Sequence, residues 1–337
     1  MFLGEKRNTK ARKGEYRMPS EMKKKVVKHE LGEVNYKTIL FEQAKEAPYV
    51  WYLTLNRPEQ NNAISIGPNE MTGEIKDAMS RANHDDNVKV IVIRGAGKNY
   101  CAGFDLSFVY RVYGGEKGQK PSQRMRLQVD QDELYGFPQA ILDCNKVVIV
   151  QVHGWAIEAG LYITKCADIV ITAENAKFSQ RGQRLAFGGL PTLPLELLMG
   201  HTKKVNELII TGRTFSGKEA EEVGYVTKAV PEEDLESEVY NLAAAISILP
   251  RDAIVMGKFA RRHMSDRLGL TCLKEVITYH TLSTNIAYSE DERDLMFIKD
   301  RKGMGHKAAF HKLHERYEDA LNKTKYFQSY DPRKKST

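Results

Sequence analysis

The fold of this chain is decided by two segments: Lys98-Asn99-Tyr100-Cys101-Ala102-Gly103-Phe104-Asp105-Leu106 and His153-Gly154-Trp155-Ala156-Ile157-Glu158-Ala159-Gly160. Each follows a largely apolar run, residues 88–93 and residues 147–152, that is typical of a buried strand. Small residues in both segments let the backbone approach a ligand closely. One main-chain N–H group from each turn could therefore stabilise negative charge on a substrate oxygen.

Strands and helices alternate on both sides of these segments. Ile39 to Phe41 and Tyr49 to Leu55 have the composition of a strand pair, which Pro58 ends. Further strands are expected at residues 88–94, 147–152, 169–172, 177–179 and 224–231, helices at 65–82 and 124–145, and a glycine-rich loop at 108–121. From about Leu193 onward the pattern is mainly helical. This order predicts an α/β body with an additional helical layer.

Composition divides the chain into four parts. We expect a basic N-terminal extension at residues 1–35, a core at 36–245, a helical C-terminal region at 246–320 and a polar tail at 321–337. The net charge of +7 is local, because residues 1–28 hold ten Lys or Arg and three Asp or Glu. The remaining 41 basic and 41 acidic residues cancel, which disfavours a body that binds nucleic acid.

Several classes of protein are disfavoured by the same composition. No apolar stretch reaches the ~18 residues of a membrane-spanning helix, and the N-terminal residues have no apolar signal core. We therefore expect a cytoplasmic protein that does not enter a membrane. The four cysteines are far apart and have no zinc-site spacing, so we expect reduced, mostly buried thiols and no metal site.

The order of several short motifs resembles the crotonase superfamily, also called the enoyl-CoA hydratase/isomerase family. The resemblance runs from about Tyr36 to about Arg316. It is carried by Leu55-Asn56-Arg57-Pro58 with Asn62-Ala63, Cys101 to Leu106, Gly154-Trp155-Ala156, Cys166 to Val170, Ala176-Lys177-Phe178, Leu208 to Gly212 with Phe215, Ala220 and Gly224, and the run Glu292 to Lys302.

This resemblance implies an α/β fold, a crotonase-like spiral of β-β-α turns with a C-terminal helical trimerisation region. It implies a homotrimer or a dimer of trimers. It also implies an acyl-CoA substrate whose thioester oxygen is bound by the main-chain N–H groups of Phe104 and Ala159. Coenzyme A enters as part of the substrate, and no other cofactor is expected. The residues that match the family's CoA-binding and acyl-binding positions are Arg57, Ala63, Ala102, Leu106, Lys258 and Phe297.

The CoA-binding interpretation has a structural alternative at each charged or aromatic position. Arg57 and Lys258 could each bind a phosphate, or could be solvated surface charges. Phe297, Lys299 and Arg301 lie in the segment that closes over CoA in the family, and Phe297 could instead be a core aromatic residue.

The chain departs from the family where protons are given and taken. Tyr162 and Gly182 stand where the two glutamates of a hydratase are usual. Tyr162 could orient a water molecule, or could be a core tyrosine. Glu158, at a position where glycine is common, could be a base whose pKa is raised by burial, or a structural carboxylate paired with Arg181 or Arg184.

Other polar residues near the two turns have less specific roles. His153 is expected beside the sheet, and Asp105 is expected to cap a turn or the following helix. Gln180, Gln183 and Arg184 are further candidates for the lining of the pocket, and Tyr110 and Tyr113 for contacts with the acyl group.

Three functions are therefore compared. Naphthoate synthases and related ring-acting enzymes also lack the glutamate at the position of Gly182, which favours a cyclic acyl group. The leading hypothesis is a hydratase of a cyclic or unusual enoyl-CoA that passes through an enolate intermediate. The alternatives are a hydrolase that opens the ring of a cyclic β-oxoacyl-CoA, with isomerisation also possible, and a non-catalytic protein of this fold that binds CoA or RNA.

Overall fold

Continuous apolar runs form the centre of a six-stranded sheet. Its order is β1 (Ile39–Gln43), β2 (Val50–Leu55), β3 (Val90–Gly95), β4 (Val147–Val152), β6 (Ile169–Ala173) and β9 (Lys228–Val230). Only the β1–β2 pair is antiparallel. The computed structural model describes residues 34–107, 121–185, 195, 201–270, 273–285 and 296–328. The predicted loop at 108–121, with Tyr110 and Tyr113, lies almost entirely outside these residues.

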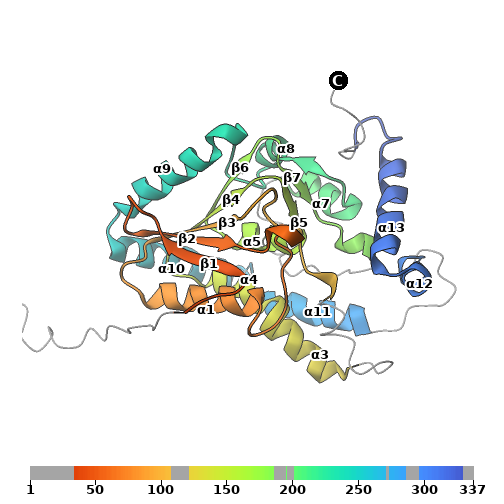
Figure 1. Ribbon diagram of the computed structural model, residues 1–337, viewed down its shortest axis with the longest axis horizontal. Coiled ribbons are helices and arrows are strands. Elements are labelled where there is room, and N and C mark those ends of the chain that lie inside the picture. The colour runs from red at the N-terminus through yellow and green to blue at the C-terminus, as the bar shows by residue number, and fades with distance from the viewer. Residues whose placement is uncertain are drawn as a thin grey trace, which may run out of the picture. The chain divides into compact units, whose positions relative to one another are not determined.

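Both faces of this sheet are covered. The four residues from Val90 to Ile93 are fully buried although they alternate between the two faces, as expected for a parallel strand inside an α/β layer. Helix α9 (Leu235–Ser247) packs on β2, β3, β4 and β6. Figure 1 shows α9 above the sheet and α1 (Met71–His84) and α4 (Gly136–Leu142) below it.

A second, shorter ladder follows the large sheet along the chain. Strands β5 (Trp155–Ile157), β7 (Lys177–Ser179) and β8 (Phe215–Ser216) form a three-stranded sheet, and an isolated bridge pairs Cys101 with Ala156. Strands β3, β4 and β6 thus each continue into a rung of this ladder. Because β3 and β4 are parallel neighbours, the turns that follow them also become neighbours. The predicted spiral α/β fold is confirmed.

The expected helix at 65–82 begins later, at Met71, and extends to His84. Gly67 has a φ of +149°, and Pro68 has no N–H group, so the chain is not helical before Met71. The Ser65 hydroxyl instead accepts a hydrogen bond from the Met71 N–H group.

The single helix expected at 124–145 is wrong. The chain forms α3 (Gln123–Val129), a π-helical segment η3 (Asp130–Leu134) and α4. Pro138 gives a physical reason, because its ring would meet the carbonyl group four residues earlier in a continuous α-helix. The buried Asp130 in η3 accepts a hydrogen bond from Thr281 Oγ1 at 2.7 Å.

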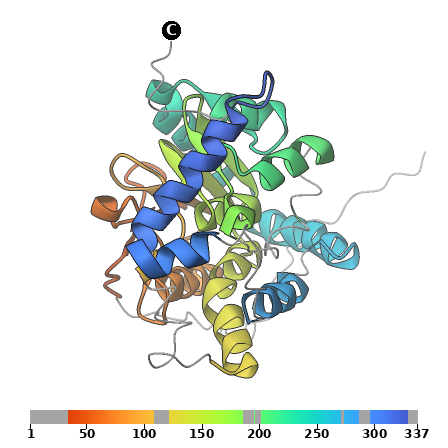
Figure 2. The ribbon, with the colours of Figure 1, turned by 90° about the vertical axis from the view of Figure 1, so that its right-hand side faces the viewer.

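The remaining described helices are α5 (Ala159–Cys166), α7 (Thr202–Thr211), α8 (Gly217–Glu222), α10 (Arg251–Arg267), α11 (Leu273–Asn285), α12 (Met296–Met304) and α13 (His306–Leu321), with short 3-10 turns at Pro58–Gln60, Gly182–Leu185 and Glu232–Asp234. Helices α12 and α13 pack on each other and face the viewer in Figure 2. Among the described residues, no helix alone is long and apolar enough to cross a membrane. The pair Glu232–Ser247 and Arg251–Arg267, bent by 103°, meets the criterion only when both helices are counted together.

Candidate active site

The two turns predicted from the sequence lie against each other. A side chain at Gly103 would come within 3.0 Å of the Ile157 carbonyl oxygen, and Gly103 also has a φ of +88°. A Cβ atom at Gly160 would lie 2.8 Å from the Cβ atom of Cys101. Glycine is therefore required at both positions for the turns to approach this closely.

Between Tyr100 and Asp105, every main-chain N–H group except that of Phe104 has a partner among the described residues. The N–H groups of Cys101 and Ala102 donate to Trp155 O and Asn61 O, and that of Asp105 donates to Ile64 O. The Gly103 N–H group contacts the Cys101 Sγ atom at 3.4 Å. The Phe104 N–H group donates to no acceptor in the described part of the chain. The Gly103 carbonyl and the Asp105 N–H group both bond the main chain of Ile64. In this parallel pairing the N–H group of Phe104, which lies between them, points away from Ile64.

The second turn has the same feature at its junction with α5. Ile157 N–H donates to Cys101 O, and Glu158 N–H donates to Ser179 O. Neither Ala159 nor Gly160, at the start of α5, donates a main-chain hydrogen bond to another described residue, and no side chain caps the helix. Both residues are buried. Buried N–H groups are nearly always paired, so these donors indicate a place for an acceptor from outside the chain.

Glu158 has a backbone conformation that side chains other than glycine rarely adopt, with a φ of +46°. Its carboxylate is held by two parts of the structure. Oε1 accepts a hydrogen bond from the Arg181 main-chain N–H group, and Oε2 accepts one from the Tyr162 hydroxyl at 3.3 Å. The main chain of Gly182 also donates to this carboxylate. One carboxylate thus contacts both positions, 162 and 182, at which the glutamates of a hydratase are missing.

Burial has the largest electrostatic effect on Glu158. Burial raises the pKa of Glu158 above its ordinary value. The hydrogen bond from Arg181, the charge of Lys165 and the hydrogen bond from Tyr162 oppose this rise without cancelling it. Neither Arg181 nor Arg184 forms a guanidinium ion pair with Glu158 in the described residues; Arg184 pairs instead with Glu318 at 2.8 Å.

Tyr162 lies one turn into α5 and is 6% exposed. Its ring contacts the ring of Phe104 edge to face, with centroids 6.1 Å apart. Tyr162 therefore contacts the first turn through the Phe104 ring and the second turn through the Glu158 carboxylate.

Arg57 connects the preceding loop to the first turn. Its guanidinium donates to Ala63 O at 2.6 Å and pairs with Asp105 Oδ2 at 2.9 Å. Burial alone would raise the pKa of Asp105, but hydrogen bonds from Ser107 and Arg57 outweigh it and lower that pKa. Asp105 also accepts from the Ser107 N–H group, so it caps its own turn as expected. A phosphate at Arg57 would have to share the guanidinium with Asp105.

Two buried asparagines that the sequence reasoning did not assign to the site hold the same loop. The Asn62 side chain donates to Ala96 O and Asn99 O, both at 2.8 Å, and accepts from the Arg57 N–H group. The Asn99 side chain donates to the Asn61 side chain and accepts from the Trp155 N–H group at 3.1 Å. The sequence does contain an indication of this loop structure in the pair Asn61-Asn62. Asn tolerates a positive φ, and both Asn61 and Asn62 have one.

The predicted substrate-binding residues divide into two groups. Ala63, Ala102 and Leu106 lie in or beside the first turn and are partly exposed. Lys258 does not join them, because its buried ammonium bonds Asp168 Oδ2 at 2.6 Å and Lys146 O at 2.7 Å. Lys146 precedes β4, whereas the second turn follows it, so the six residues of β4, about 20 Å, separate Lys258 from the site. This ion pair explains the lysine as a structural residue of this subunit.

Phe297 and His153 also lie apart from the carboxylate. Phe297 is buried in a small cluster with Ala309 and Leu313, and its ring meets that of Phe310 at 6.5 Å. A ring nitrogen of His153 lies 2.9 Å from Gly97 O, at the back of the first turn, as expected for a residue beside the sheet.

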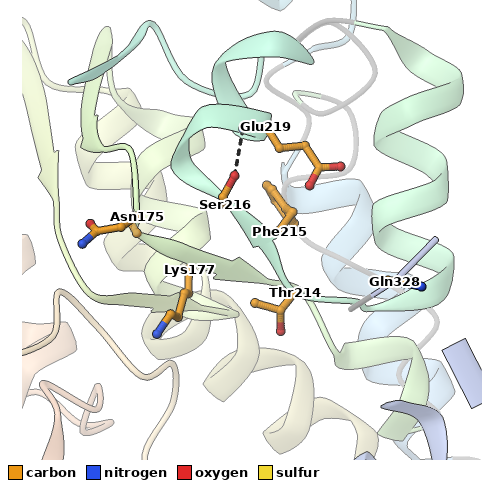
Figure 3. A pocket seen from close by; sticks show the side chains of 8 residues that line it. Asn175, Lys177, Thr214, Phe215, Ser216, Glu219 and Gln328 are labelled. Carbon is orange, nitrogen blue, oxygen red and sulfur yellow. Dashed lines mark hydrogen bonds between the residues drawn. The ribbon is translucent and has the colours of Figure 1, made fainter. Parts of the chain in front are cut away.

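A surface pocket of about 460 Å³ lies elsewhere on the small sheet. Figure 3 shows Asn175, Lys177 and Thr214 around it, with Ser216 accepting a hydrogen bond from the Glu219 N–H group. The pocket is lined by residues at the start of β7 and by β8 with the residue before it, whereas Glu158 contacts the main chain after β7. None of the predicted site residues lines it.

Comparisons with known proteins show the family of this chain. Residues 45–298 match the enoyl-CoA hydratase/isomerase family. The chain is 31% identical to the peroxisomal Delta(3,5)-Delta(2,4)-dienoyl-CoA isomerase of Arabidopsis thaliana, over 63% of this chain and 77% of that protein. An enoyl-CoA hydratase structure from Mycobacterium smegmatis aligns with a TM-score of 0.72 and 22% identity, over 88% of this chain and 99% of that chain. An enoyl-CoA hydratase/isomerase structure from Xanthobacter autotrophicus Py2 aligns with a TM-score of 0.70 and 24% identity, over 84% and 99%. The two structures share the fold of this chain.

Proposed function

Because this chain belongs to the enoyl-CoA hydratase/isomerase family, an acyl-CoA-processing family, we propose that it hydrates an enoyl-CoA whose acyl group is cyclic or otherwise unusual. The observation that carries the proposal is the position of Glu158. Its two oxygens contact residues at both places where the family's glutamates are missing, Tyr162 and Arg181-Gly182. A single carboxylate could therefore do the proton transfers that two normally share.

The proposed reaction begins with the thioester oxygen on the N–H groups of Phe104 and Ala159. Both groups lack an acceptor among the described residues, and they belong to turns in close contact. One such donor typically contributes about 3 kcal/mol of transition-state stabilisation. The amino-terminal end of α5, which begins at Ala159, adds its favourable dipole.

The carboxylate of Glu158 then removes a proton from a water molecule held with the Tyr162 hydroxyl. The water oxygen forms a bond to the β carbon, and the electron pair of the Cα–Cβ double bond moves to the thioester oxygen. The resulting enolate takes a proton at the α carbon, and the protonated Glu158 is the donor closest at hand. The raised pKa of Glu158 makes its carboxylate a stronger base toward the water molecule than an ordinary carboxylate.

The cyclic or bulky acyl group is supported by the residue types around the carboxylate. Gly182 contributes no side chain where a glutamate is usual, and the Phe104 and Tyr162 rings offer flat apolar surfaces. The proposed chemistry uses no cofactor other than the CoA of the substrate.

Product analysis with ¹⁸O-labelled water tests the proposal. Hydration incorporates one labelled oxygen as an alcohol. Ring opening of a β-oxoacyl-CoA places it in a new carboxylate, and isomerisation incorporates none but exchanges protons with the solvent. Isomerisation is the second candidate, because one carboxylate also suffices to move a proton between two carbons. Tight binding of acyl-CoA without any turnover would contradict the enzyme and favour a binding protein; loss of RNA binding after removal of residues 1–28 would then identify an RNA-binding role.

We also propose that the chain forms a homotrimer or a dimer of trimers. The support is apolar exposure on and beside α10, where Ile248, Met256, Phe259, Met264 and Leu268 are each at least 60% exposed. Exposed apolar surface of this kind usually marks a contact between proteins, and assembly into a trimer would cover it.

A further inference from the structure

Lys165 is a buried lysine whose ammonium group lies below the candidate site. The residue is 2% exposed, and its Nζ atom bonds Gln180 Oε1 at 2.6 Å. The same ammonium lies 5.7 Å from the Tyr162 ring centroid and 5.4 Å from that of Tyr225. Burying an ammonium is costly unless other groups compensate for the lost water. A buried lysine at this place is therefore expected to have a specific role.

The helix places this lysine on the same face as the proposed base. Glu158, Tyr162 and Lys165 are spaced by four and three residues, so they follow one side of α5 from its cap onward. Tyr162 links the other two, since its ring faces the ammonium and its hydroxyl donates to Glu158.

A second connection runs through the segment after β7. Gln180, which accepts from Lys165, directly precedes Arg181, whose main-chain N–H group donates to Glu158. The Tyr225 hydroxyl also donates to Gln180 Oε1 at 3.3 Å. One Glu158 oxygen is thus bonded to Tyr162, which Lys165 contacts, and the other is bonded to Arg181, the neighbour of Gln180.

We propose that Lys165 is a positioning residue that keeps Glu158 ionised and fixes Tyr162 and Gln180 around it, so that the carboxylate is ready to accept a proton. This role rests on the proposed function only in that Glu158 is taken as the base. The charge of Lys165 lowers the pKa of Glu158 against the larger effect of burial, in agreement with the geometry.

The other charged and titratable groups around the carboxylate are few in the described residues. On α5 they are Tyr162 and Lys165, and from the segment after β7 comes Arg181, whose guanidinium donates to Ser179 and Thr214. Burial and the neighbouring Arg184 lower the pKa of Arg181 to about 10, so it remains charged at neutral pH. The charge of Lys165 lowers the pKa of Glu158, whereas Arg181 lowers it through its main-chain N–H group.

The test compares Lys165→Met with the wild type by direct titration of Glu158. Carboxyl-¹³C glutamate labelling gives a resonance that Glu158→Gln identifies by its disappearance, and it needs no turnover. We expect Lys165→Met to raise the Glu158 midpoint by about one pH unit, because loss of a nearby opposite charge has effects of that size. The acidic limb of kcat/KM should move by the same amount, while KM changes little.

Lys146→Met is the matched control, because Lys146 is also buried and its ammonium bonds the Asp85 carbonyl oxygen at 3.0 Å before β4 begins. It should change stability without moving the Glu158 midpoint. Lys165→Arg keeps the charge, so its Glu158 midpoint should stay close to that of the wild type. If Lys165→Met is unstable, the melting curve of Lys165→Arg shows whether a charged variant still folds. An unmoved midpoint in folded Lys165→Met, or an equal rise in Lys165→Met and Lys165→Arg, would overturn the inference. A wild type that titrates as expected but turns over no acyl-CoA would overturn only the proposed function.

Discussion

The Tyr162 hydroxyl donates to Glu158 Oε2 at 3.3 Å across one turn of α5, which joins the position of a missing glutamate to a carboxylate the family does not usually have there. The other Glu158 oxygen reaches the main chain beside Gly182. The two departures of the sequence are therefore connected in space, and Glu158 is their common partner.

Substitution Glu158→Gln tests this carboxylate as the base. The amide keeps the size of the side chain but cannot accept the proton, so we expect kcat to fall by about 10²- to 10⁴-fold. The dissociation constant for CoA should stay within about threefold, because binding of the nucleotide does not depend on the proton. Steady-state kinetics and calorimetry measure the two quantities, and unchanged kcat would exclude Glu158 as the base.

Tyr162→Phe is expected to lower turnover far more than it weakens CoA binding. The ring remains against Phe104, so the packing is kept, while the hydroxyl that contacts Glu158 is lost. An equal loss in turnover and in binding would instead indicate that Tyr162 has a packing role.

Asp105→Asn tests the connection that Arg57 makes between the two loops. The pair is mostly buried, with side-chain exposures of 15% and 17%, so we expect the free energy of unfolding to fall by about 1–3 kcal/mol. Turnover should fall as the first turn loosens. The exposed pair Lys218–Glu174 provides the control, and Glu174→Gln should change stability by less than about 0.5 kcal/mol. If Arg57 serves only a phosphate, Asp105→Asn will leave stability unchanged.

The low pKa of His314 makes the free energy of unfolding depend on pH. Burial and the charges of Arg181 and Arg184 lower the pKa of His314 from 6.5 to about 2. Below pH 6.5 the unfolded chain therefore binds a proton that the folded chain does not, and stability falls by about 1.4 kcal/mol per pH unit as the pH decreases. Urea unfolding between pH 7.5 and pH 5 measures this loss. The wild type should lose more stability than His314→Phe, and the difference between the two proteins removes the contribution of all other titrating groups. His263→Phe, at an exposed position on α10, should retain the wild-type dependence.

The α10 surface predicts the oligomeric state. Phe259→Glu places a charge at an exposed apolar position and should convert a trimer into monomers of 38.3 kDa in light scattering. Tyr326→Glu, at an exposed aromatic residue near the end of the chain, should leave the mass unchanged. A wild type that is monomeric at micromolar concentration would contradict the proposed assembly.

Local signals explain which parts of the fold could be predicted from the sequence. The buried strands β3 and β4 and the two turns after them are each encoded within about ten residues, by apolar runs followed by small residues. The short strands β5 and β8 were missed, because pairing of two or three residues depends on neighbours distant in the sequence. The break before α4 did have a local signal, Pro138, which should have divided the predicted helix.

The site was predictable to the same extent. Phe104, Ala159, Tyr162 and Glu158 were identified from two motifs, and the structure brings their turns together. The partners of Arg57 and Lys258 could not be predicted, because Asp105 and Asp168 lie 48 and 90 residues away. The burial of Lys165 gave no signal either, since lysine is among the residues least often buried.

A structure of the protein with a bound, unreactive acyl-CoA thioester tests the central claim most directly. The account predicts the thioester oxygen at about 2.7–3.1 Å from the main-chain nitrogens of both Phe104 and Ala159, with the Glu158 carboxylate facing the α and β carbons. A thioester oxygen bound to any other pair of groups, with these two amides turned away from it, would contradict the account.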